Sequence, residues 1–142
     1  MHRLARIKYD INVMKFISMF ESATGAQLHD SFMQDEKIVF VVKQGQIGKA
    51  LGKRGANIRK LENLLKKKIR IIEFNDDVLQ FVRNAVHPLQ AKDITEEAGV
   101  ITIIPLDSKT RGYLIGRSAA NLRNTESIIQ RYFKDVKEIK VV

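Results

Sequence analysis

The chain has 142 residues, no cysteine and a formal net charge of +9 at pH 7. Its hydrophobic content of 44% can form the core of one ordinary domain or of two very small ones, and it excludes a disordered tail. The lack of cysteine excludes disulfides and thiolate metal sites, and the N-terminal segment has no apolar run long enough for a signal peptide or a membrane span. We therefore expect a cytoplasmic protein that has no membrane partner and binds a polyanion.

Apolar spacing in residues 1–75 predicts one series of elements: helix, strand, strand, short helix, glycine loop, helix, strand. Asp10 is the expected N-cap of the first helix, which should end at Gly25. The second and third strands are expected over residues 38–42 and 68–74. The helix positions that should face a core are Val13, Ile17, Phe20, Ile58, Leu61 and Leu65.

Residues 76–142 repeat this series of elements. A helix is expected to begin at Asp76 or Asp77, which both have side chains suited to an N-cap, and to stop at Pro88. On the helix that follows the second glycine region, the expected core positions are Leu122, Thr125, Ile129 and Tyr132. The strands that flank this region should cover residues 99–104 and 137–142.

Two segments of the chain superpose at an offset of 64 residues: GKALGKRGANIRK at 48–60 and GYLIGRSAANLRN at 112–124. Residues 52–55 are named the first loop here, and residues 116–119 the second loop. The repeat predicts two small domains, and because no flexible linker composition separates them we expect a fixed relative orientation. The equivalent pairs are Gly48 and Gly112, Leu51 and Ile115, Gly52 and Gly116, Lys53 and Arg117, Asn57 and Asn121, Ile58 and Leu122, and Arg59 and Arg123.

The positive charge is concentrated around the first loop. Residues 43–70 hold ten basic residues against the single acid Glu62, which equals the whole net charge of +9. Residues 106–134 hold six basic residues against two acids. An isolated run of lysines usually solvates a helix face, and residues 66–68 at a helix end keep that alternative open. Around a glycine-rich loop, the same charge favours a nucleic-acid ligand.

An enzyme that binds nucleotides is the other class to weigh. A P-loop requires a glycine where Ile47 stands and a hydroxyl side chain where Arg54 stands. A Rossmann fingerprint requires a glycine in place of Ala50. The three histidines are scattered without the spacing of metal ligands. We therefore expect no enzyme, no metal and no cofactor.

The first loop has the properties of a clamp for a nucleic-acid backbone. Two glycines without Cβ atoms let a sugar-phosphate chain come close. The helix expected from Ala56 onward offers free N–H groups and the positive end of its dipole to a phosphate. Lys53 and Arg54 add positive charge at the same point.

The residues GKRG of the first loop, with Ile47, Gly48 and Leu51 before them and Ile58 after them, resemble the KH family. Loops of this family hold about four nucleotides of a single strand. Two strands before the loop and one after it match the type II order of elements. The resemblance implies an α/β (α+β) fold of tandem type II KH domains, each a three-stranded sheet covered by helices. The first, with an N-terminal helix, would occupy residues 1–75 and the second residues 76–142.

The whole chain is similar to the paired KH region of NusA transcription factors. Residues 74–94 resemble the acidic joint that connects the two KH domains in that family. Its segment 19–27 and its length resemble the short archaeal form. The resemblance implies a single-stranded RNA-binding transcription termination or antitermination factor that acts on nascent transcripts. The alternative is a KH-type RNA-binding protein for ribosome or ribonucleoprotein assembly. Bacterial members also have a polymerase-binding domain and an OB-type domain, for which 142 residues leave no room, so RNA polymerase or its elongation complex is only a candidate partner.

The second loop departs from the KH pattern, since Ala119 replaces the last glycine of the loop and Ser118 replaces the basic or small residue expected before it. An alanine disfavours positive φ, so we expect this loop to be weakened rather than lost, with a purely structural copy as the alternative. The residues expected to contact RNA are Ile47, Gly48, Lys49, Leu51, Gly52, Lys53, Arg54, Gly55, Asn57 and Arg59 in the first domain, and Gly112, Ile115, Gly116, Arg117, Ser118, Ala119, Asn121 and Arg123 in the second.

Overall fold

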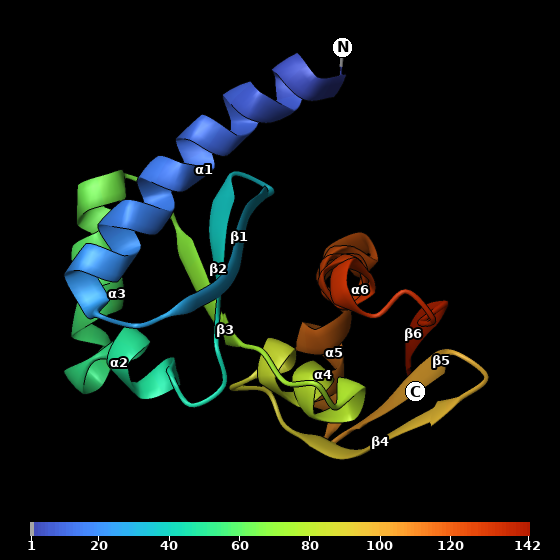
Figure 1. Cartoon of the computed structure of the whole chain (residues 1–142). Coiled ribbons are helices and arrows are strands. Elements are labelled where there is room, and N and C mark those ends of the chain that lie inside the picture. The colour runs from blue at the N-terminus through green and yellow to red at the C-terminus, as the bar shows by residue number, and fades with distance from the viewer. Residues whose placement is uncertain (1) are drawn as a thin grey trace. The chain divides into compact units, whose positions relative to one another are not determined.

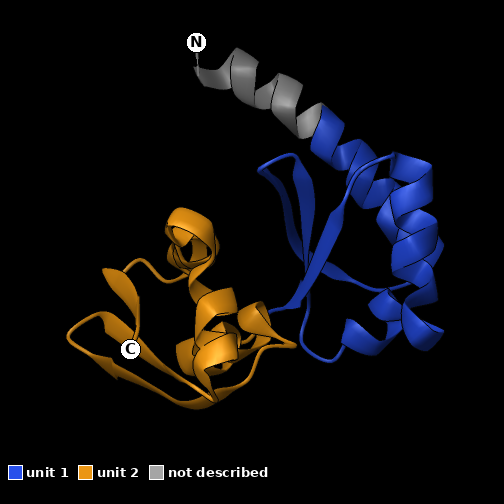
Figure 2. Ribbon diagram, turned by 180° about the vertical axis from the view of Figure 1, so that it is seen from behind, with its two compact units in different colours: residues 1–74 blue, residues 75–142 orange. Residues whose placement is uncertain are grey.

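The computed structural model describes residues 2–142, with side chains from residue 12 onward. The chain forms two compact units, residues 1–74 and residues 75–142, which we name unit 1 and unit 2 (Figure 2). Each unit contains one three-stranded sheet together with helices (Figure 1). The mixed α/β class predicted from the sequence is therefore confirmed.

Unit 1 is built around the central strand of its sheet. β2 pairs with β1 in the antiparallel sense and with β3 in the parallel sense. A parallel pair needs a crossover connection, and two helices with the first loop between them supply it. The elements of unit 1 are α1 (His2–Thr24), β1 (Leu28–Gln34), β2 (Lys37–Val42), α2 (Ile47–Leu51), a 3-10 turn (Lys53–Gly55), α3 (Ala56–Leu65) and β3 (Ile69–Glu73).

The first helix is longer than predicted. It begins at His2, so Asp10 does not stand at its start, and the side chain of Asp10 lies outside the described ones. Residues 2–9 contain neither glycine nor proline, so nothing in their composition stops the helix from extending ahead of Asp10. The predicted end is confirmed: Gly25 adopts a left-handed φ of 72° and donates its N–H to the carbonyl of Glu21 at 2.9 Å.

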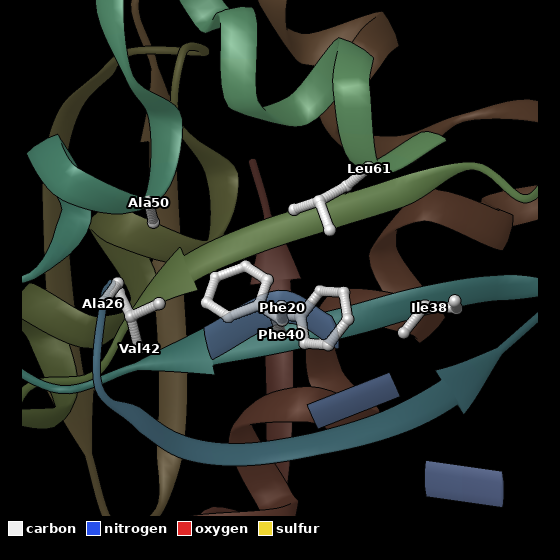
Figure 3. Packing of buried hydrophobic residues seen from close by; sticks show 7 residues of the cluster. All are labelled: Phe20, Ala26, Ile38, Phe40, Val42, Ala50 and Leu61. Atoms are coloured by element: carbon white, nitrogen blue, oxygen red, sulfur yellow. The ribbon is translucent and has the colours of Figure 1, made fainter. Parts of the chain in front are cut away.

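The core of unit 1 fixes α2 and α3 on the sheet. Phe20 of α1 stacks on Phe40 of β2 with 4.3 Å between ring centroids. Ala50 of α2 and Leu61 of α3 are fully buried in the same cluster, so both helices next to the first loop are anchored there. Figure 3 shows the seven buried residues of this cluster: Phe20, Ala26, Ile38, Phe40, Val42, Ala50 and Leu61.

Unit 2 repeats the architecture of unit 1. Its central strand β5 pairs antiparallel with β4 and parallel with β6, and two helices with the second loop between them again form the crossover. The predicted order of elements is thus confirmed in both halves of the chain. The elements are α4 (Val78–Val86), β4 (Ala91–Glu97), β5 (Val100–Pro105), α5 (Ser108–Ile115), a 3-10 turn (Arg117–Ala119), α6 (Ala120–Tyr132) and β6 (Glu138–Val141).

The start of α4 decides between the two candidate caps. The Asp77 carboxylate accepts a hydrogen bond from the N–H of Leu79 at 3.0 Å, so Asp77 is the N-cap. Within unit 2, α4 packs on α6. The rings of Phe81 and Tyr132 form a T-shaped pair with 5.6 Å between their centroids. Thr125 and Ile129 of α6 are buried as predicted, whereas Leu122 and Tyr132 are half-buried.

Candidate nucleic-acid interface

The first loop has a backbone that only glycine adopts easily at its first position. Gly52 has φ 69° and ψ 179°, a region almost closed to other residues. A Cβ atom there would also lie 2.8 Å from the side chain of Asn57. Arg54 and Gly55 follow in left-handed conformations, with φ of 55° and 72°. The chain itself therefore requires Gly52, whether or not a ligand is bound.

Two side chains of α3 hold this loop in shape. Asn57 donates from Nδ2 to the carbonyl of Lys49 at 2.9 Å, which ties the start of α3 to α2. Arg59 donates from Nη1 to the carbonyl of Arg54 at 2.7 Å. The sequence predicted RNA contacts for Asn57 and Arg59 but not this positioning role. Contact of these two side chains with RNA stays a prediction.

The second loop has the same backbone shape as the first. Gly116 adopts φ 73° and ψ 175°, and Ser118 adopts φ 53° and ψ 32°, against 55° and 32° at Arg54. Ala119 takes the left-handed conformation of Gly55, with φ 61° and ψ 22°, although its Cβ makes this cost about 1–2 kcal/mol. Asn121 donates to the carbonyl of Tyr113 at 2.9 Å, as Asn57 does in unit 1. The second loop thus keeps the shape of the first and loses part of its charge.

Gly48 and Gly112 differ from the loop glycines, because no described part of the chain requires them. Each lies inside a helix, and a Cβ atom added there would meet no described atom within 4 Å. A glycine inside a helix costs up to about 1 kcal/mol relative to alanine. The helix surface beside each loop is therefore bare at this point, so another molecule can approach the backbone closely.

The basic side chains near the first loop are mostly exposed. Burial lowers the pKa of Arg70, and its guanidinium remains charged because an arginine does not lose its proton in proteins. Glu62, the single acid of the segment, accepts a hydrogen bond from the N–H of Ile69 at 3.0 Å and so joins α3 to β3. The exposed basic residues are Lys43, Lys49, Lys53, Arg54, Arg59, Lys60, Lys66, Lys67 and Lys68.

The acids close to the second loop also have structural roles. Glu126 accepts from the N–H of Ile139 at 2.9 Å, which matches the bond of Glu62 in unit 1. Asp107 is the N-cap of α5 and accepts from the N–H of Thr110 at 2.7 Å. Hydrogen bonds from the side chain and the backbone of Thr110 lower the pKa of Asp107. These carboxylates support the helices next to the loop.

The described residues offer neither a metal site nor a membrane span. This part of the chain contains no group of three or more His, Cys, Asp or Glu residues that could hold a metal ion. None of its helices is long and apolar enough to cross a bilayer. The candidate site consists of the two loops and the basic residues around them.

A family model of the KH domain matches residues 16–87, which include the first loop and the whole sheet of unit 1. A probable transcription termination protein NusA of Methanococcus vannielii is 38% identical over 140 residues, covering 96% of this chain and 80% of that protein. Its counterpart in Methanocaldococcus jannaschii is 32% identical, covering 98% and 77%. The chain belongs to the NusA-like KH proteins.

The fold of this NusA-like KH protein is also found in a solved structure. The crystal structure of APE1850 matches with a TM-score of 0.74 at 22% identity, covering 93% of this chain and 99% of that one. At this identity the likeness supports the fold alone. The match to the KH family model ends at His87 and does not reach the second loop. The description of the second loop therefore rests on its own backbone geometry.

Proposed function

We propose that the protein binds single-stranded RNA through its two loops and acts as a transcription termination or antitermination factor. The observation that carries the proposal is the first loop, a KH loop with a preformed backbone, a bare glycine beside it and exposed basic side chains around it. KH loops hold the backbone of about four nucleotides. The transcriptional process is inferred from the relatives, which are probable transcription termination proteins.

We further propose that unit 2 is a second KH domain, so that residues 1–75 and 76–142 form a tandem pair. The support is the repeated order of elements, the matching loop dihedrals and the equivalent hydrogen bonds of Asn57 and Asn121. A chain segment that only braced unit 1 would have no need of a strained Ala119 or a bare Gly112.

In the proposed complex, phosphates lie at the loops and bases lie beside the helices. Lys53, Arg54 and Arg117 are exposed and supply positive charge, while the N-termini of α3 and α6 supply free N–H groups. Half-buried Ile47, Leu51 and Ile115 offer apolar edges to the bases. RNA polymerase or its elongation complex is a proposed further partner.

Cross-linking of the native protein to cellular RNA tests the process. We expect the recovered RNA to be nascent transcripts, with RNA polymerase in the same complexes. Recovery of ribosomal particles instead would favour the alternative function in ribosome or ribonucleoprotein assembly and would overturn the transcriptional proposal.

Binding to single-stranded RNA is expected to weaken steeply with added salt, by a slope of about 0.7 in log affinity per log salt for each neutralised phosphate. A perfect duplex of the same sequence should bind much more weakly, because a KH groove takes unstacked bases. Fluorescence anisotropy titrations at several salt concentrations measure both quantities. Equal affinity for duplex and single strand would contradict the proposed loops.

The variants Gly48→Ala and Gly112→Ala are expected to fold normally and to bind RNA more weakly. The added methyl group meets no described atom and favours the helix, so stability should stay equal or rise by up to about 1 kcal/mol. The same methyl group would block the approach of RNA, for which we expect about a tenfold loss of affinity, the equivalent of one good contact. Thermal unfolding of each variant measures its stability, and RNA titration measures its affinity.

Gly52→Ala is the matched control for Gly48→Ala and Gly112→Ala, because it adds the same methyl group at a glycine that the fold itself requires. Its Cβ would meet Asn57 at 2.8 Å in a backbone region that disfavours alanine, so it should destabilise the fold by about 1–3 kcal/mol. Unchanged RNA affinity in both Gly48→Ala and Gly112→Ala would show that no ligand approaches these positions.

A further inference from the structure

Tyr113 is an exposed aromatic residue next to the second loop. Its relative exposure is 56%, and among the described large hydrophobic residues that are exposed it is the one with an aromatic ring. A single exposed apolar residue needs no explanation by itself, but a ring beside a candidate nucleic-acid site is informative. The ring is not needed for the core of unit 2, since the next residue, Leu114, is the buried one.

The backbone around Tyr113 belongs to the machinery of the second loop. Tyr113 lies in the last turn of α5, three residues before Gly116, and its carbonyl accepts the hydrogen bond from Asn121 at 2.9 Å. The bare helix position at Gly112 precedes it directly. Lys109 stands one helical turn earlier on the same face of α5, and exposed Arg117 opens the turn after Gly116. The ring is thus bracketed along the chain by two basic side chains.

The two units differ in chemistry at equivalent places. The counterpart of Tyr113 in unit 1 is Lys49, which is exposed and has its carbonyl held by Asn57 in the same way. The counterpart of Arg54 at the centre of the loop is Ser118. At these two places unit 2 lacks the positive charges of unit 1, and at one of them it has an exposed ring on the same loop backbone, whereas Lys109 and Arg111 stand where unit 1 has Gly45 and Ile47. Lost charge reduces attraction for phosphates, whereas a ring offers a face to a base.

We propose that Tyr113 is a base-stacking residue of the second loop, against which an unpaired base of the bound RNA lies. Stacking of bases on aromatic side chains tolerates any sequence, because every base has a flat face. Unit 2 would then hold one base on the ring of Tyr113, in addition to the phosphate and apolar contacts proposed for both units. This inference rests on the proposed RNA-binding function and adds to it the kind of contact that unit 2 makes.

The variant Tyr113→Trp provides a direct test, because the chain contains no other tryptophan. Titration of the full chain with single-stranded RNA should quench the fluorescence of this tryptophan as the ring stacks on a base. An abasic strand with the same sugar-phosphate backbone should bind at low salt with little quenching. Equal quenching by the abasic strand would overturn the proposal, because it would show that the ring responds to the backbone.

Three further variants separate the ring from its surroundings. Tyr113→Phe keeps the ring and should bind RNA like the wild type, whereas Tyr113→Ala should lose about tenfold in affinity. Tyr113→Lys installs the residue of unit 1, so it should lose the preference for strands with bases and steepen the salt dependence by about 0.7 per added phosphate contact. All three change an exposed side chain, and thermal unfolding should confirm an unchanged fold.

The outcomes distinguish this inference from the proposed function. If the wild type binds RNA and Tyr113→Ala binds it equally well, the stacking proposal is wrong. If the wild type binds no single-stranded RNA, the proposed function itself fails. Loss of affinity in Tyr113→Ala together with retention in Tyr113→Phe would support stacking.

Discussion

Replacing both Lys53 and Arg54 by Asp is expected to reduce affinity for single-stranded RNA on the order of a hundredfold or more. Each of these exposed side chains is expected to make a charged hydrogen bond to a phosphate, and two such bonds at about 1.5 kcal/mol correspond to a factor of about 100. The reversed charges add repulsion to this loss. The same change at Arg117 and Ser118 removes one basic side chain and should cost about tenfold.

The difference between the two loops follows from charge, since their backbones match. Residues 43–70 carry the entire net charge, and the single acid among them, Glu62, is bonded to the backbone of β3. The second loop has Ser118 where the first has Arg54. Fluorescence anisotropy titrations with one single-stranded RNA show which of the two double variants loses more affinity. Equal losses from the two double variants would contradict it.

A control with the same change in net charge separates the loop from the general field of unit 1. Lys67→Asp with Lys68→Asp alters two exposed lysines at the other end of α3, beyond its last residue Leu65. Their effect should be smaller than that of the first-loop variant and should fade at physiological salt, where charges are screened beyond about 8 Å. If both double variants lost affinity equally at that salt, the first loop would not be a specific phosphate site.

The repeated glycine pattern made most of the fold predictable. A loop of fixed shape between two helices requires glycine at Gly52 and Gly116, so the repeat was visible in the sequence and placed both crossovers. The cap of α4 was predictable to within one residue, as Asp77 shows. The start of α1 was predicted wrongly, since Asp10 has the side chain of an N-cap but no helix breaker precedes it.

Other features depend on three-dimensional contacts that the sequence does not display. An alanine disfavours a positive φ, yet Ala119 adopts φ 61° between the two helices of the crossover, at a cost of about 1–2 kcal/mol. The bonds of Asn57 and Asn121 became visible only with the carbonyls of Lys49 and Tyr113 in place, although the equal spacing of both asparagines after the glycine was a signal. Tyr113 gave no signal in the sequence repeat, because Lys49 stands at the equivalent position of unit 1.

The joint between the units is short, and the residues on each side of it are bonded within their own unit. The N–H of Phe74 donates to the carbonyl of Val42 at 2.9 Å, and the ring of Phe74 stacks on His29 with 3.9 Å between centroids. Asp77, which already caps α4, donates its N–H to the side chain of Asn75 at 2.8 Å. No stretch of glycine and serine intervenes. The fixed orientation of the two units that this short joint suggests stays a prediction.

A strand long enough to reach both loops is expected to bind on the order of a hundredfold more tightly than a strand that covers either loop alone. Linked sites gain this advantage because the second contact forms at a high effective concentration, and the gain falls when the link becomes longer and looser. Inserting a Gly/Ser segment of about ten residues after Asn75 should remove about tenfold of the advantage while each unit stays folded. Titrations of the wild type and of the insertion variant with short and long strands measure this difference in affinity.

The same segment inserted between Asp35 and Glu36, at the turn between β1 and β2, is the matched control. It adds equal length and composition at a hairpin tip, where insertions are well tolerated, and leaves the joint intact. This control should keep the full advantage of the long strand, because it does not change the link between the loops. An insertion after Asn75 that left the affinity for the long strand undiminished would show that the two units bind RNA independently, and the short joint would then have no role in recognition.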